Sequence, residues 1–216
     1  PPRSTLFPYT TLFRSVKVSP FFIAALLDVA SSEWGVKAEV PMFRDVRVML
    51  GRKPYAFLNY HWEDGAAVAE FVNKSLAYGV FASSNTNWGT GVQYEINENG
   101  YYRDRKLLDW YVPLVRRLSA AGWEPVRHAA VTGDSVSSER FGRGERVYFT
   151  LFNDGTTPTA ATLKPDLTAL GFAEAPLSIA EIARSAEMYQ SRDGTLHLKL
   201  EPKKTYVIEL RRSAAL

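Results

Sequence analysis

The sequence predicts an α/β segment followed by an all-β segment. Two strand–helix units alternate in the first half of the chain, whereas short strands separated by turn signals fill the second half. The period of the apolar residues changes from helical to alternating just after Trp123. The boundary between the two segments is therefore expected near residues 122–125.

The composition is that of a globular protein. Of the 216 residues, 46% are hydrophobic and 23% are charged, and no apolar run approaches the ~20 residues that a membrane helix needs. The chain has no cysteine, which excludes disulfides and leaves the compartment open, secretion or export to the periplasm included. The formal net charge is only +3, so a nucleic-acid partner is not expected.

Residues 1–15 stand apart from the rest of the chain. PPRSTLFPYTTLFRS has no helical or alternating period and lacks the basic start and apolar run of a signal peptide. Codon by codon, Thr5–Ser15 resembles the in-frame translation of a common short-read sequencing adaptor. We therefore expect residues 1–15 to be a non-native segment from a metagenomic read, and the native start to be missing. Without Arg3 and Arg14 the net charge is +1, from 24 basic and 23 acidic residues.

The α/β segment begins with two predicted helices and a strand. Apolar residues at helical spacing predict a helix over Ser19–Ser32, and a second, short helix is predicted over Met42–Leu50. The run Tyr55–Tyr60 is continuously apolar and aromatic, as expected of a strand buried on both faces of a parallel sheet. The helix that follows has Asp64 as its expected N-cap and Gly79 as its stop.

The strand–helix pattern then repeats once. Val80–Ala82 is a short predicted strand, and Ser83–Gly89 is a polar loop. A strongly amphipathic helix is predicted over Asp104–Ala121, where apolar residues recur every three or four positions. Pro113 lies inside this helix and is expected to kink it or to remove one backbone hydrogen bond. Gly122 is expected to end it.

The second half predicts an antiparallel β-sandwich with its own alternating core. Two Asp-Gly pairs are hairpin-turn signals, and three leucines alternate with polar residues along the strand that ends at Leu200. Evenly spaced short strands of this kind are typical of a sandwich. The predicted strands are Pro125–Val131, Val136–Phe141, Arg146–Asn153, Thr159–Leu163, Leu177–Ala183, Glu187–Gln190, Thr195–Leu200 and Thr205–Leu210.

The order of these elements predicts part of a (β/α)₈ barrel with an appended sandwich. A whole barrel takes ~250 residues, so residues 16–122 have room for its last two or three units, and residues 123–212 form the sandwich domain. A doubly wound parallel sheet is the rival architecture. It is less favoured because no Gly-rich phosphate loop follows either strand, and no cofactor is expected for the same reason.

Several stretches resemble glycoside hydrolases of the α-galactosidase-like and α-amylase-like kind. "KPYAFLNY", "AVAEFVNKSLAYG", "VFASSNTN" and the long helix that follows resemble the last two barrel units of such enzymes. "SSERFGRGERVYFTLFNDG" and "GTLHLKLEPKKTYVIEL" resemble their C-terminal β-sandwich. The resemblance covers about Pro54–Leu210 and includes no diagnostic catalytic motif. It implies that the nucleophile and the acid/base lie on earlier barrel strands, so the catalytic residues stay unassigned.

Candidate substrate-binding residues follow the two predicted barrel strands. Barrel active sites are built at the C-terminal ends of the strands, and a sugar site needs apolar rings to stack on together with amides or carboxylates for the hydroxyl groups. The residues of these types at the two strand ends are Asn59, His61, Trp62 and Glu63, and then Asn85, Asn87 and Trp88.

Each candidate also has a structural interpretation. Trp62 and Trp88 would pack over the top of the barrel, and the two asparagines of the second loop would form turns. No metal site is predicted, because His61, His128 and His197 lie in separate elements. The sequence thus favours the C-terminal fragment of an enzyme that hydrolyses glycosidic bonds in a carbohydrate substrate. The alternative is a non-catalytic carbohydrate-binding or structural β-sandwich module.

Overall fold

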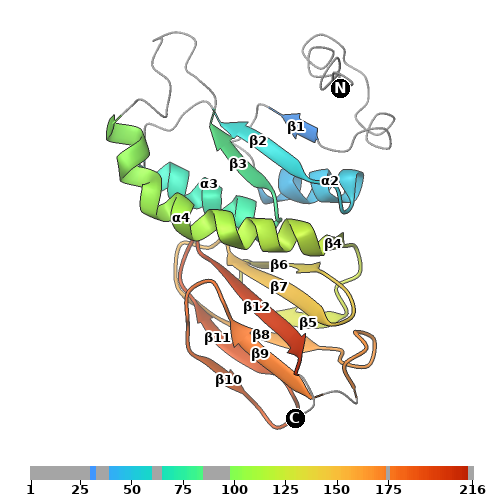
Figure 1. The fold of residues 1–216 in the computed structure, drawn as a ribbon. Helices are drawn as coiled ribbons and strands as arrows, with labels where there is room; N and C mark the ends of the chain where they lie inside the picture. The colour runs from blue at the N-terminus through green and yellow to red at the C-terminus, as the bar shows by residue number, and fades with distance from the viewer. Residues whose placement is uncertain (1–29, 33–38, 60–64, 85–97, 174–175, 214–216) are drawn as a thin grey trace, which may run out of the picture.

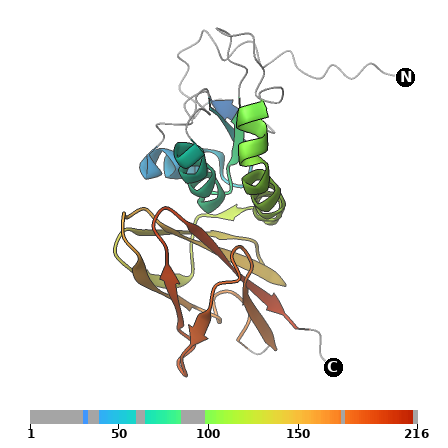
Figure 2. The same ribbon diagram turned by 90° about the vertical axis from the view of Figure 1, so that its left-hand side faces the viewer.

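The computed structural model describes residues 30–32, 39–59, 65–84, 98–173 and 176–213 (Figure 1). They form a three-stranded sheet A of order β1-β2-β3, a five-stranded sheet B of order β4-β6-β7-β12-β9 and a four-stranded sheet C of order β10-β11-β8-β5. Helices α3 and α4 lie between sheet A and sheet B, and sheet C covers the other face of sheet B (Figures 1 and 2).

Sheet A and its helices make up the first half of the chain. Its strands pair in parallel, as predicted for strand–helix units. The elements are β1 (Ala30–Ser32), α2 (Val40–Leu50), β2 (Tyr55–Asn59), α3 (Gly65–Ala77), β3 (Phe81–Ser84) and α4 (Glu98–Ala121).

The predicted helix over Ser19–Ser32 is wrong at its C-terminal end. Ala30–Ser32 is strand β1, which pairs with β2 in a register that sets Ala30 opposite Tyr55. The rest of the predicted helix, residues 19–29, lies outside the described residues. Short segments with small side chains have a weak local preference, so pairing with a neighbouring strand decides their conformation.

In residues 123–173 and 176–213 the structure has strands and turns but no helix, and all the strands pair antiparallel. Strand β7 begins and ends where the alternation predicts, and so does β6. The strands are β4 (Trp123–Glu124), β5 (Ala129–Thr132), β6 (Val136–Phe141), β7 (Arg146–Asn153), β8 (Thr159–Pro165), β9 (Leu177–Glu181), β10 (Met188–Gln190), β11 (Leu196–Leu200) and β12 (Thr205–Arg212).

The strand predicted over Pro125–Val131 is wrong over its first four residues. Strand β5 begins only at Ala129, because His128 has a φ of 50°, which is the left-handed region and incompatible with an extended strand. The chain instead forms the short strand β4, Trp123–Glu124, against β6.

Helix α3 ends at the predicted glycine. Gly79 has a φ of 60°, its N–H binds the carbonyl of Leu76 at 3.0 Å, and the N–H of Val80 binds the carbonyl of Ser75 at 2.8 Å. This pair of bonds is a Schellman motif. A Cβ on Gly79 would also lie 2.5 Å from the ring of Phe141, so both the backbone conformation and the packing require glycine here.

Helix α4 begins six residues before the predicted Asp104 and continues through Pro113. Its apolar stripe is buried as the spacing predicts, at Tyr111, Leu114, Val115 and Leu118. Pro113 lies on the exposed face, where water reaches the carbonyl that its missing N–H leaves unpaired.

Sheet B is buried on both faces, and β7 shows this most clearly. Along this strand Val147, Phe149 and Leu151 pack against sheet C. Tyr148 and Phe152 belong to the opposite face of the strand. Tyr148 packs in a hydrophobic cluster with residues of α3 and α4, and Phe152 packs in a hydrophobic cluster with residues of sheet A and α2. The two halves of the chain therefore share apolar cores.

Buried polar groups join the same two halves. The side-chain carbonyl of Asn73 in α3 accepts from the N–H of Thr205 at 3.0 Å and from Arg184 at 2.6 Å. The hydroxyl of Thr205 donates to the backbone carbonyl of Asn73 at 2.6 Å. The hydroxyl of Thr150 in β7 donates to the carbonyl of Ala77 at 2.6 Å. A buried polar group without a partner is costly, so these bonds fix how α3 sits on sheet B.

We expect Thr150→Val to destabilise the protein by about 1–3 kcal/mol, because it removes the hydroxyl and leaves the buried carbonyl of Ala77 unpaired. The measurement is the free energy of unfolding from urea denaturation. Thr162→Val is the matched control, since its hydroxyl bonds only to Thr132 in an exposed position, and it should cost less than about 0.5 kcal/mol. Equal losses from the two variants would contradict the prediction.

Candidate functional site

The C-terminal ends of β2 and β3 lie side by side in sheet A. Asn59 is the last residue of β2 and Ser84 is the last residue of β3, and the parallel register makes these two residues partners. Neighbouring strands lie about 4.7–4.9 Å apart. The chain therefore leaves both strands at the same edge of the sheet, as the prediction of a shared site requires.

Of the seven predicted site residues, the structure places Asn59 by its backbone, at the end of β2. The other six lie outside the described residues. Their assignment to sugar subsites stays a prediction, and so does the alternative that the two tryptophans pack over the strand ends. The six residues are His61, Trp62, Glu63, Asn85, Asn87 and Trp88.

A buried tyrosine of α4 anchors the start of β3. The Tyr111 hydroxyl donates to the carbonyl of Val80 at 2.5 Å and accepts from the N–H of Ala82 at 2.7 Å. Burial raises the pKa of Tyr111, so the hydroxyl keeps its proton and remains a donor at any physiological pH. Helix α4 thereby fixes the strand that leads to the second predicted loop.

A buried arginine of α2 anchors the start of β2. Arg47 donates to the carbonyl of Tyr78 at 2.5 Å, to that of Lys53 at 2.8 Å and to that of Gly79. Burial lowers its pKa to about 10, so the guanidinium still carries its charge at neutral pH. Strands β2 and β3 are thus both held at their N-terminal ends.

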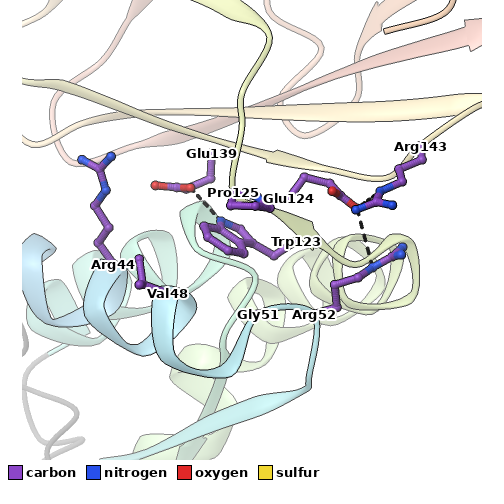
Figure 3. A pocket seen from close by; sticks show the side chains of 9 residues that line it. All are labelled: Arg44, Val48, Gly51, Arg52, Trp123, Glu124, Pro125, Glu139 and Arg143. Carbon is purple, nitrogen blue, oxygen red and sulfur yellow. Dashed lines mark hydrogen bonds and ion pairs between the residues drawn. The ribbon is translucent and has the colours of Figure 1, made fainter. Parts of the chain in front are cut away.

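A cavity of about 340 Å³ lies beyond those N-terminal ends (Figure 3). Gly51 and Arg52 line it just before β2 begins, so it is at the opposite end of the strand from Asn59. Barrel active sites lie at the C-terminal ends of the strands. The position of the cavity therefore argues against it as the site of a barrel reaction. The remaining lining residues are Arg44, Val48, Trp123, Glu124, Pro125, Glu139 and Arg143.

The first carboxylate of the cavity is neutralised by arginines. Glu124 is only 2% exposed. Arg143 binds it at 2.6 Å, Arg140 at 3.4 Å and Arg52 at 3.7 Å, and Figure 3 shows Arg52 and Arg143 approaching it together. A buried charge that is paired in this way holds elements together: the turn after α2, strands β4 and β6, and the β6–β7 turn meet at Glu124.

The second carboxylate of the cavity is the chemically unusual one. Burial raises the pKa of Glu139, and this outweighs the hydrogen bond from Trp123 and the positive charge of Arg44, which both lower it. The indole N–H of Trp123 donates to Glu139 Oε2 at 2.7 Å (Figure 3). Neither glutamate was singled out by the sequence analysis. The dense mixture of Glu and Arg in SERFGRGER is the signal that could have indicated this cluster.

Two other features are absent from the described part of the chain. No group of three or more His, Asp or Glu side chains comes together there as a metal site would require. None of the helices described by the structure is long and apolar enough to cross a bilayer.

No family model matches the sequence, and no curated protein does. Solved structures do match in fold. An alpha-amylase from Geobacillus thermoleovorans, solved in complex with acarbose, has a TM-score of 0.55 at 11% identity over 92% of this chain and 53% of its own. A putative alpha-galactosidase from Bacteroides fragilis has a TM-score of 0.55 at 12% identity over 90% and 45%. An alpha-amylase from H. orenii has a TM-score of 0.50 at 10% identity over 92% and 52%.

The chain has a glycoside-hydrolase-like fold. At identities of 10–12% these likenesses concern the fold alone, and the chain spans about half the length of the structures that it matches. Two of them are alpha-amylases and the third is a putative alpha-galactosidase, which are the two kinds of enzyme that the sequence resembles.

We expect the free energy of unfolding of the Glu139→Gln variant to increase relative to that of the wild type as the pH rises. A carboxyl whose pKa is raised by folding contributes stability below its unfolded pKa of ~4.3, and this is lost as the pH rises through the folded pKa. The amide keeps an acceptor for Trp123 and does not ionise. Urea denaturation at pH 4 and pH 8 measures the difference between the variant and the wild type.

Glu201→Gln is the control for that measurement, because it removes a carboxylate that is about half exposed. Its stability relative to the wild type should change little between the two pH values. A Glu139→Gln difference that stays constant from pH 4 to pH 8 would contradict the assignment of a raised pKa.

Proposed function

We propose that this chain is the C-terminal part of an enzyme that hydrolyses glycosidic bonds. The observation that carries the proposal is the parallel pairing of β2 with β3, which brings Asn59 and Ser84 to one edge of sheet A in a glycoside-hydrolase-like fold. In a barrel this edge is where substrate binds. The loops that follow the two residues would then line neighbouring sugar subsites.

The barrel assignment is part of the same proposal. Residues 16–122 would be the last two or three units of a (β/α)₈ barrel, residues 123–212 the sandwich domain, and residues 1–15 a non-native segment. The three parallel strands, each followed along the chain by a helix, support the first of these. The chain also covers about half of each matched structure, which agrees with a part of a larger enzyme.

The residues present would bind substrate, and the reacting carboxylates would lie on earlier strands. A glycosidase needs two carboxyl groups, about 5–5.5 Å apart for retention and 6.5–9.5 Å apart for inversion. Glu63 is the only acid among the seven predicted site residues. The two glutamates of the cavity are at the other end of β2 and are used to bind Arg143 and Trp123.

The second candidate function is a non-catalytic carbohydrate-binding sandwich. One observation favours it: Tyr189 in β10 is 67% exposed, and its ring lies 5.7 Å from the ring of His197 on the neighbouring strand. An exposed aromatic ring is a surface on which a sugar can stack. The two candidate functions place the sugar on different sheets, so single substitutions can separate them.

We expect Trp62→Ala and Trp88→Ala each to weaken binding of an α-linked gluco- or galacto-oligosaccharide by about tenfold, or about 1.4 kcal/mol. The loss of a stacking ring affects the ligand more than the core. Isothermal titration calorimetry measures the affinity, and circular dichroism checks the fold. Tyr189→Ala is the matched variant on the sandwich. If it weakens binding and the two tryptophan variants do not, the sandwich function replaces the barrel function.

We also expect the purified chain to leave an activated aryl glycoside intact, because Glu63 is the only acid among the predicted site residues and one acid cannot supply both catalytic groups. Release of the chromophore measures hydrolysis. Hydrolysis that is lost in Glu63→Gln would make Glu63 a catalytic residue and would overturn the assignment of the carboxylates to other strands.

A further inference from the structure

A shallow groove of about 700 Å³ is bordered by the C-terminal turn of α4, the β6–β7 turn and the end of β12. In Figure 1 the three segments lie toward the right-hand side of the molecule. Its basic lining residues are all arginines, and Glu145 is the only acid among the lining residues. The arginines are Arg52, Arg117, Arg143, Arg146, Arg211 and Arg212.

Four of these arginines already have acidic partners. Arg52 and Arg143 share Glu124. Arg146 lies 3.3 Å from Glu209, and Arg212 lies 3.4 Å from Glu145. Their side chains are nevertheless 40–66% exposed, so their remaining N–H groups can reach a ligand in the groove.

The other two arginines give the groove a surplus of positive charge. Arg117 and Arg211 are exposed, and neither forms an ion pair with the residues that the structure describes. Arg211 is also the direct partner of Arg146 across strands β12 and β7. Like charges directly opposite each other in a sheet are destabilising, and an anion between the two would relieve this.

We propose that this groove binds the acidic groups of a polysaccharide, the carboxylates of uronate units or sulfates. The guanidinium group presents N–H donors in a planar fork that matches such groups. An open groove suits a chain better than a small metabolite. The sugar identity rests on the proposed function. The groove is a second site, because Arg52 precedes β2 whereas the predicted subsites follow its other end.

The alternative polyanion is a nucleic acid, and the groove is less suited to it. Single-stranded nucleic acids are held by aromatic rings on which bases stack. The one aromatic residue that lines the groove, Tyr148, is buried with 3% exposure.

The test is a titration of the whole chain with polygalacturonate, dextran sulfate, neutral dextran and a double-stranded DNA fragment. We expect the two acidic polysaccharides to bind and neutral dextran not to. Arg117→Gln/Arg211→Gln should weaken the binding by about tenfold. Both positions are exposed and without an acidic partner among the described residues, so the variant should keep the wild-type melting temperature or raise it slightly, since Arg211→Gln also removes the like charge opposite Arg146. Raising the salt concentration from 50 to 200 mM should weaken binding as well.

Arg105→Gln/Arg192→Gln is the matched control, because it removes the same charge from exposed positions away from the groove. An equal loss in this control would overturn the location of the site. Failure of the acidic polysaccharides to bind, or tighter binding of DNA, would overturn the ligand class. Binding of neutral α-linked oligosaccharides is measured alongside and tests the subsites that follow β2 and β3. Its failure alone would overturn the proposed function and leave the arginine groove as an anion site.

Discussion

The buried C-terminal end of α3 is the constraint on which the tertiary structure depends. A helix end leaves backbone carbonyls without partners inside the helix, and sheet B covers this end. The hydroxyl of Thr150 donates a hydrogen bond to the backbone carbonyl of Ala77, which is 73 residues away in the sequence. The hydroxyl of Thr205 donates to the backbone carbonyl of Asn73, which is 132 residues away. The carbonyl of Ala77, the last residue of α3, is therefore paired only when β7 is in place, and β12 adds a bond to the carbonyl of Asn73, which makes the two halves of the chain dependent on each other.

Arg47 extends this dependence to α2 and sheet A. Its guanidinium donates to the carbonyls of Tyr78 and Gly79 and so places a positive charge at the C-terminal end of α3, where the helix dipole is negative. The same guanidinium binds the carbonyl of Lys53, just before β2 begins. A buried guanidinium is costly unless its donors are used, so this residue forces α2, the end of α3 and the start of β2 into one arrangement. The positions of the strand ends follow from it.

The sequence was informative where local pattern and tertiary environment agree. Strand β7 and the stop at Gly79 were predicted at the residues observed, because alternation and glycine conformation are local properties. Ala30–Ser32 and His128 were mispredicted, because their conformations depend on partners far along the chain or on a single backbone angle. Asn59 is the last residue of β2, within the strand predicted over Tyr55–Tyr60, and the other predicted site residues lie outside the described residues.

Net charge is a sum over the whole chain, so it does not indicate the groove lined by arginines. The net charge of the chain is +3. This small overall surplus of basic residues does not exclude a local cluster of them. Folding brings six arginines from α4, sheet B and the turn before β2 to one groove, although they are spread over 160 residues of sequence. Only Arg211 and Arg212 are adjacent, so a search for basic runs does not detect the cluster.

The groove and the predicted subsites would lie toward opposite ends of β2 and would bind different chemical groups of a ligand. Under the two proposals, arginines at one end would form ion pairs with acidic groups, whereas the predicted subsites at the other end would bind neutral hydroxyl groups. Strand β2 has five residues and rises about 3.3 Å per residue, so its two ends are about 13 Å apart, too far for one small ligand to bind at both. A polymer of sugars is the kind of ligand whose length allows contact with both.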